Sequence, residues 1–353
     1  MSLLTLQISN VRCIEAADLE LPSGLSLFYG VNGSGKTSIL EAIFLLGRGR
    51  SFRTRNTARL IRHGQDRLRV IGQVGGAATA PITIGIESSG TETAARIRGE
   101  PVHSLAELSQ AFAVQVIEPG IHRLLEEGGQ RRRRWMDWAV FHVEPQFVQM
   151  WTRYTRTLKQ RNAALRTDST HASAWDTELA RSGEEVAAAR ARLLQDLEPH
   201  WRSTVTALTG LELELHYTRG WDAEHSLLEA LTRAHARDIA RQVTHAGPHR
   251  ADVSVRLRGR IAREVLSRGQ QKLVAVAMTV AQMRLLQQRL GITPTLLLDD
   301  PAAELDAQHL QAFIAQVNQL RTQLMITSLG AESRLFGIPE RTFHVDQGRV
   351  QPL

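Results

Sequence analysis

The residues best suited to chemistry form one run near the start of the chain. Residues 30–37 follow the pattern G-x-x-x-x-G-K-T, after an apolar stretch and before a helical one. In such a loop, glycines let backbone N–H groups surround phosphate oxygens, the lysine neutralises charge and the hydroxyl binds Mg²⁺. A glycine-rich hairpin is the less favoured alternative. We expect these residues to bind a nucleoside triphosphate: Gly30, Val31, Asn32, Gly33, Ser34, Gly35, Lys36, Thr37 and Ser38.

Two carboxylates far along the chain are the natural partners of that loop. The apolar strand 295–298 ends in Asp299 and Asp300. A phosphate-loop enzyme needs such carboxylates on the strand beside its loop, one to orient Mg²⁺ and one to polarise the attacking water. We expect Thr37 and Asp299 to be metal ligands, and Lys36, Asp299 and Asp300 to be catalytic. The alternative is a buried strand that ends in a polar turn.

A third candidate lies at the start of a long apolar-rich helix, residues 273–290. Ser267 is placed to cap this helix, and Gly269 and Gln270 follow it. Free N–H groups and the helix dipole suit such a start to an anion. We assign Ser267, Gly269 and Gln270 to nucleotide binding through the γ-phosphate; an ordinary capped helix is the alternative.

The surrounding elements indicate a split head with an inserted arm. Residues 68–74 and 81–86 alternate apolar and polar side chains, as in a half-buried antiparallel sheet. Between about 120 and 241 the apolar spacing becomes helical and predicts two helices of ~25 residues, each ~35 Å long. We expect an α/β fold with a mixed and an antiparallel sheet. Residues 1–118 and 242–353 would form the head, and 119–241 a short helical arm domain.

Composition bounds the class of protein. The 353 residues carry a formal net charge of +7, and the pI of about 10.4 favours polyanions such as nucleic acid. No apolar run approaches the ~18 residues that a membrane span requires. A single cysteine, Cys13, excludes an internal disulfide. We expect a globular protein of the cytoplasm with no membrane partner.

The order of the motifs resembles the heads of ABC/SMC-type ATPases. The phosphate loop is followed by L-S-x-G-Q at 266–270, by the strand with two aspartates, and by Glu304-Leu305-Asp306. In that superfamily the signature helix of one subunit covers the nucleotide held by the phosphate loop of another. The resemblance implies ATP as the nucleotide and a homodimer that forms when ATP binds.

Further motifs resemble those of one family, RecF, in the same order along the chain. They lie at residues 47–54, 131–138, 158–165 and 247–252, and the resemblance extends from Leu4 to about Gly348. It implies a weak ATPase that binds gapped or duplex DNA. It also implies a role in DNA replication and SOS-linked repair, where the protein acts with RecR and RecO and helps load RecA.

Some segments depart from the family pattern or leave a role open. Residues 301–303 read P-A-A, without the serine expected there, and residues 117–120 read I-E-P-G in place of S-P-E-D. Asp300 is shorter than the glutamate of many relatives, which predicts slow hydrolysis. Gln115 is either a nucleotide-sensing residue or a plain strand residue. Thr327 stands where ABC relatives often carry a switch histidine, and we assign it γ-phosphate sensing.

Basic residues and histidines offer weaker signals. The run Arg131 to Arg134 can grip phosphates or form structural ion pairs. His245 and His249 are four residues apart, but Gly247-Pro248 breaks the helix that would make them a metal pair. Several arginines beyond the loop helix can reach DNA or nucleotide: Arg48, Arg50, Arg53, Arg55 and Arg59.

Two rival functions use part of the same motifs. An ABC-type transporter ATPase subunit shares the nucleotide motifs, but it needs a membrane partner and does not account for the helical insertion. A small-molecule kinase uses the phosphate loop without the signature residues 267–270, and it would remain monomeric with ATP.

Overall fold

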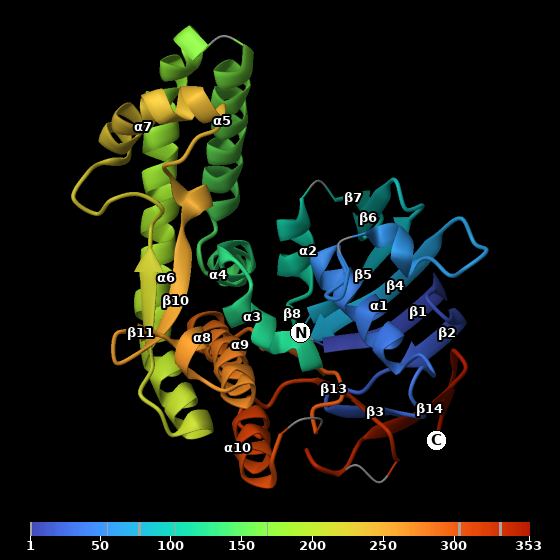
Figure 1. Ribbon diagram of the computed structural model, residues 1–353. Helices are drawn as coiled ribbons and strands as arrows, with labels where there is room; N and C mark the ends of the chain where they lie inside the picture. The colour runs from blue at the N-terminus through green and yellow to red at the C-terminus, as the bar shows by residue number, and fades with distance from the viewer. Residues whose placement is uncertain are drawn as a thin grey trace. The chain divides into compact units, whose positions relative to one another are not determined.

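The computed structural model describes residues 2–54, 56–76, 79–102, 104–167, 169–302, 305–331 and 334–353. The chain divides into two compact units, and the elements of each can be followed in Figure 1. The first unit comprises Met1–Ile121, Ala207–Thr209 and Lys272–Leu353, and the second comprises His122–Thr206 and Gly210–Gln271.

An antiparallel sheet and a mainly parallel sheet build the first unit. The antiparallel sheet has the order β2-β1-β4-β5-β6-β7, with β2 Ile14–Glu20, β1 Ser2–Val11, β4 Leu68–Gly76, β5 Thr79–Ser88, β6 Thr93–Ile97 and β7 Glu100–Pro101. The other has the order β15-β14-β3-β13-β12-β8, with β15 Arg349–Pro352, β14 Arg341–Asp346, β3 Leu25–Tyr29, β13 Leu324–Ser328, β12 Thr295–Leu298 and β8 Val114–Ile117. Only the pairing of β14 with β15 is antiparallel in this second sheet. The predicted α/β class, with mixed and antiparallel sheets, is confirmed.

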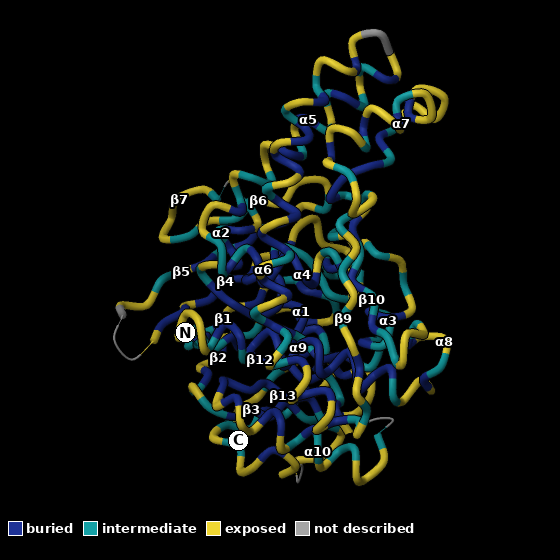
Figure 2. The backbone as a smooth tube through the Cα atoms, turned by 90° about the vertical axis from the view of Figure 1, so that its left-hand side faces the viewer, coloured by how far each residue is buried: buried dark blue, intermediate teal, exposed yellow. Residues whose placement is uncertain are grey.

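Helix α1 (Lys36–Arg48) forms the centre of the core of this unit. It contacts β1, β4 and β5 of the antiparallel sheet and β8 and β13 of the parallel one. Every residue of α1 except Thr37 is buried, as expected for a helix that is apolar on nearly all sides. Strands β3 and β13 are also buried along most of their length (Figure 2). The phosphate loop therefore joins two buried elements and has little freedom at either end.

Shorter elements complete the first unit. They are η1 Thr57–Leu60, α2 Leu105–Ala111, η2 Pro119–His122 and α10 Ala307–Asn318. The long helix α9, Arg268–Leu290, begins in the second unit and continues in the first. Its apolar residues are buried from Leu273 to Leu286.

The second unit packs helices around a small antiparallel sheet of order β11-β10-β9. Its strands are β9 Glu214–Thr218, β10 Asp252–Leu257 and β11 Arg260–Ile261. Its helical elements are α3 Arg123–Glu126, α4 Gly129–Val143, α5 Phe147–Thr167, η3 Ser169–Trp175, α6 Asp176–Thr209, α7 Leu227–Arg241, η4 Pro248–Arg250 and α8 Ala262–Val265.

This unit differs from the expected arm in its extent and in its helices. It continues to Gln271, because β10 pairs with β9 and packs against α4, so residues 242–271 group with the arm helices. The expected length of ~25 residues does not hold for both helices. Helix α5 has 21 residues and α6 has 34, since its buried stripe continues through Trp201, Val205 and Leu208.

Candidate nucleotide-binding site

The phosphate loop joins β3 to α1 and is fixed by main-chain hydrogen bonds. Gly30 N donates to Ser328 O (3.2 Å) and so ties the loop to the end of β13. Gly348 N donates to Ser34 O (2.7 Å) and ties it to the turn between β14 and β15. Gly35 has a φ of +118°, a conformation that side chains with a Cβ rarely adopt. The loop shape is therefore set before any ligand binds.

Lys36 opens α1 with its ammonium group turned back onto the loop. Its Nζ donates to Gly30 O (2.6 Å) and Val31 O (2.8 Å). Burial lowers the pKa of Lys36, while Asp299 and Asp300 act in the opposite direction. These bonds to neutral carbonyls leave the lysine charge uncompensated by direct contact, so phosphate oxygens are better partners for it.

Asp299 meets the loop from the end of β12. Thr37 Oγ1 lies 3.0 Å from Asp299 Oδ1 and 3.2 Å from Oδ2. Thr327 Oγ1, at the end of β13, donates to Asp299 Oδ1 at 2.9 Å. Burial raises the pKa of Asp299, and the hydrogen bonds from Thr327 and Thr37 offset part of that shift. The fold thus brings together the two predicted metal ligands, Thr37 and Asp299, from positions 262 residues apart.

We expected the two aspartates to follow the strand beside the loop strand, and this expectation is wrong. Strand β13 lies between β3 and β12, so Thr327 stands between the loop strand and the carboxylates. Asp300 has a φ of +48°, and its backbone N donates to Thr327 Oγ1 at 2.8 Å. Thr327 therefore bonds to both aspartates. The sequence suggested γ-phosphate sensing for this residue but not these contacts, which depend on strand order.

The groups around the loop suit a triphosphate and Mg²⁺. Ser34 Oγ is buried and has no hydrogen-bond partner among the described residues. Residues 31–33, by contrast, are exposed at the open side of the loop. Mg²⁺ prefers hard oxygen ligands, which the Thr37 hydroxyl and the Asp299 carboxylate provide. The donor set therefore fits both groups.

Ser267 caps α9 as predicted. Gln270 N donates to Ser267 Oγ (3.3 Å), and Ser267 N donates to Gln270 Oε1 (3.0 Å), a reciprocal capping box. Apart from its chain neighbours and the backbone of its own helix, no described residue lies within 4 Å of where a Cβ on Gly269 would stand. These residues belong to the second unit and the phosphate loop to the first.

Arg53 lies near enough to Asp299 for its charge to act on that carboxylate. Ser51 Oγ accepts hydrogen bonds from the backbone N of Arg53 (3.0 Å) and of Thr54 (3.1 Å), which fixes this turn. Burial raises the pKa of Asp299, and the nearby charge of Arg53 works against that shift. Among the arginines beyond the loop helix, Arg55 lies outside the described residues.

Other predicted residues take ordinary structural contacts. Gln115 Nε2 donates to Gln282 Oε1 (3.2 Å), and both side chains are buried. Asp306 caps α10 by accepting from His309 N (3.0 Å). Ala303 and Glu304 lie outside the described residues. Nucleotide sensing by Gln115 stays a prediction.

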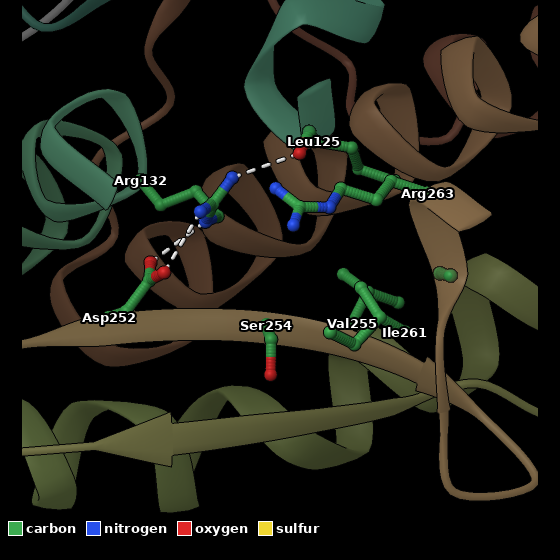
Figure 3. Close-up of a pocket in the computed structure, with 8 residues that line it drawn as sticks. Leu125, Arg132, Asp252, Ser254, Val255, Ile261 and Arg263 are labelled. Atoms are coloured by element: carbon green, nitrogen blue, oxygen red, sulfur yellow. Dashed lines mark hydrogen bonds and ion pairs between the residues drawn. The ribbon is translucent and has the colours of Figure 1, made fainter. Parts of the chain in front are cut away.

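The arginine run at the start of α4 is largely structural. Arg131 pairs with Glu127 at 2.8 Å. Arg132 forms two bonds to Asp252, at 2.8 and 2.9 Å, and both residues line a cavity of about 90 Å³ that Arg263 also faces (Figure 3). Arg133 Nη1 instead donates to a carbonyl, Ala251 O, at 2.6 Å. The ion-pair alternative is confirmed for Arg131 and Arg132.

His245 and His249 bind different partners. His245 Nδ1 bonds Asp238 Oδ1 at 2.8 Å. His249 Nδ1 lies 2.5 Å from the Tyr154 hydroxyl, and its Nε2 lies 3.0 Å from Thr244 O. A carbonyl can only accept, so Nε2 carries the proton and Nδ1 accepts from Tyr154. Both rings therefore fix the loop 244–252.

Comparisons with solved structures agree with this architecture. RecF-ATPrS, described as the recombination mediator protein of the RecFOR pathway, is 25% identical with a TM-score of 0.87, covering 100% of this chain and 98% of its own. An SMC head bound to the C-winged helix domain of ScpA is 13% identical with a TM-score of 0.61, over 100% and 97% of the two chains. The second likeness shows the fold alone.

Sequence comparisons give the family. The family model RecF/RecN/SMC N terminal domain matches residues 2–346. The DNA replication and repair protein RecF of Shewanella baltica (strain OS223) is 39% identical over 358 residues, and that of Shewanella sp. (strain MR-7) is 39% identical over 362. Each match covers 99% of both chains. Over the described residues, no helix has the length and apolar content to cross a bilayer. The transporter alternative finds no support in these comparisons, and the chain belongs to the RecF family of DNA replication and repair proteins.

Proposed function

We propose that this chain is an ATP-dependent DNA-binding protein of recombinational repair, with ATP and Mg²⁺ as cofactors. The observation that carries the proposal is the meeting of Thr37 with both oxygens of Asp299, beside the Lys36 ammonium. Membership of the RecF family supports DNA as the binding partner, and the solved relative RecF-ATPrS supports ATP as the nucleotide.

ATP hydrolysis in this proposal is weak and acts as a switch. Lys36 binds the β- and γ-phosphates, Thr37 and Asp299 hold Mg²⁺, and Asp300 polarises the attacking water. When bound, Mg²⁺ neutralises phosphate charge. The left-handed backbone of Asp300 and its bond to Thr327 restrict where the short carboxylate can reach, which supports slow turnover.

ATP also brings two copies of the chain together. Gly269 lies in the first turn of α9, and no contact with the described residues outside its own helix requires a glycine there. An approaching surface from outside the protomer accounts for it. Ser267, Gly269 and Gln270 would then cover the γ-phosphate held by the phosphate loop of the second copy.

The dimer binds DNA in the cytoplasm. The formal charge of +7 supports attraction to the phosphates of gapped or duplex DNA. Family membership supports RecR and RecO as partners and the loading of RecA as the outcome. We keep residues 1–118 and 242–353 as the proposed ATPase head and 119–241 as the proposed arm. This functional division assigns residues 242–271 to the head, although they belong to the second compact unit.

Binding of a fluorescent gapped duplex with ATP, with ADP and without nucleotide tests this function. ATP alone should give tight, salt-sensitive binding and a dimer in sedimentation. Lys36→Ala should abolish ATP binding, whereas Ser267→Arg should keep ATP binding and lose the dimer. Equal DNA affinity with ATP, with ADP and without nucleotide would refute the proposal. An ATP-bound monomer that phosphorylates a small molecule would favour the kinase alternative.

A further inference from the structure

Arg133 and Arg250 of the second unit make no direct contact with a carboxylate among the described residues. Arg133 on α4 donates from Nη1 to Ala251 O at 2.6 Å, and Arg250 at the end of η4 donates from Nη2 to Thr244 O at 3.3 Å. Both acceptors are neutral main-chain carbonyls. Arg250 is exposed and Arg133 is half-buried, so solvent ions can reach them.

The two carboxylates nearest Arg133 are each committed to another arginine. Asp252 receives Arg132 through two bonds of 2.8 and 2.9 Å (Figure 3). Asp137 receives Arg190 through two bonds of 2.8 and 3.0 Å. The local balance is therefore four guanidinium groups against two carboxylates, which leaves the positive charge of Arg133 and Arg250.

Burial lowers the pKa of Arg133, and the charges of Arg190 and Arg250 lower it further. The two carboxylates, Asp252 and Asp137, act in the opposite direction. Arg133 thus stands in a field of like charge that an anion would relieve. A guanidinium group presents paired N–H donors that match the oxygens of a phosphate group.

The backbone around this pair of arginines is rigid. His249, beside Arg250, is held between the Tyr154 hydroxyl (2.5 Å) and Thr244 O (3.0 Å). Gly129 leaves room for Arg133, because a Cβ there would stand 2.8 Å from its Nη1. Fixed donors lose little conformational freedom when they bind, which favours a specific contact over a diffuse one.

We infer that Arg133 and Arg250 form a binding site for the phosphodiester backbone of DNA. The inference rests on the proposed DNA-binding function and places one contact of that function on the loop 244–252. The run at 131–134 and the segment 247–252, which the sequence presents as separate motifs, thereby contribute one arginine each to a single site.

Salt titrations of duplex binding in the presence of ATP test this site in the full chain. The double variant Arg133→Gln, Arg250→Gln should bind duplex DNA at least about tenfold more weakly, with the slope of log affinity against log salt smaller by about 1 to 2. ATP affinity and the thermal midpoint should match the wild type. Arg202→Gln removes the same charge from an exposed, ion-paired position of the second unit and should change DNA affinity less than twofold.

Each other outcome overturns the inference in a recognisable way. Wild-type-like DNA binding by the double variant would leave an acidic protein segment as the ligand of this site. An equal loss of DNA affinity in Arg202→Gln would mean that DNA binding depends on net charge and not on this site. Failure of the wild type to bind DNA would refute the proposed function together with this site. If the double variant unfolds, the single variant Arg250→Gln tests the site, because the exposed Arg250 side chain makes one bond to a carbonyl and its loss should leave the fold intact. The inference then requires that Arg250→Gln lower DNA affinity at least threefold.

Discussion

The proposed nucleotide-binding residues of the first unit bond to groups that a ligand can replace, whereas the buried arginines described in the second unit pair with carboxylates of the protein. Lys36 bonds to loop carbonyls, and Thr37 bonds to Asp299. Arg161, fully buried, donates to Asp176 (2.6 Å) and Asp238 (2.7 Å). Lys36 and Thr37 can exchange their partners for a ligand, whereas Arg161 cannot do so without leaving a buried carboxylate unpaired.

Arg190 is a second buried arginine of this unit that pairs with a carboxylate. Arg190 forms two bonds to Asp137 and one to Pro248 O (2.7 Å), and its guanidinium lies 5.1 Å from the centre of the Trp151 ring. Such pairs add little net stability, but breaking one is costly. Their contribution here is positional, because they hold the loop 244–252 against the arm helices. Arg133 and Arg250 differ from them in having only carbonyl partners.

We expect the largest loss of stability from removing Arg161. Arg161→Met leaves the fully buried Asp238 without its arginine and should lower the free energy of unfolding by about 3–5 kcal/mol. ATP affinity of the folded protein should stay within twofold. Urea denaturation and nucleotide titration measure the two quantities. Arg202→Met, at an exposed pair, should cost less than about 0.5 kcal/mol. A loss below ~1 kcal/mol for Arg161→Met would show that the network is dispensable.

Acid should weaken the second unit through His249. Burial lowers the pKa of this histidine from 6.5 to about 4, so the folded state keeps the neutral ring. The unfolded chain takes up the proton first as pH falls, and stability is lost between about pH 6.5 and pH 4. From pH 7 to pH 5 the loss should be about 2 kcal/mol. His249→Gln should remove this part of the slope in denaturant unfolding; an unchanged slope would assign it to other groups.

A variant of Thr327 tests how strongly the proposed metal ligands, Thr37 and Asp299, depend on their neighbours. Thr327→Val keeps the shape but removes the donor to Asp299 and the acceptor for Asp300 N. The Mg²⁺ concentration that half-saturates ATP binding should rise about tenfold. Thr327→Ser should restore it, since serine retains the hydroxyl. Equal effects of valine and serine would mean that packing matters more than the hydrogen bonds.

Ser267 gives the smallest expected change in stability. Ser267→Ala removes the side-chain acceptor of Gln270 N and should cost about 1 kcal/mol in thermal or urea unfolding. Gln270→Ala removes the reciprocal bond and should cost no more. ATP-dependent dimerisation should fall in both variants by more than this stability loss explains. Intact dimerisation in both would separate the cap from nucleotide binding.

The sequence was sufficient for features whose residues are contiguous or follow a simple period. The phosphate loop, the start of α9 at Ser267 and the buried strand before Asp299 were all predicted, because short runs determine loop shape, capping and strand burial. Order along the chain also identified the family. The arginines of 131–134 stayed ambiguous, since a run of like charges does not say where its partners are.

Only the tertiary structure decided contacts between distant segments. Sheet order placed β13 between β3 and β12, and so made Thr327 a neighbour of both aspartates. The pairing of β9 with β10 moved residues 242–271 into the second unit. Arg161 meets Asp238 across 77 positions of the chain. Periodicity and local propensity carry no information about such pairings, because burial and hydrogen bonding select them only when the whole chain has packed.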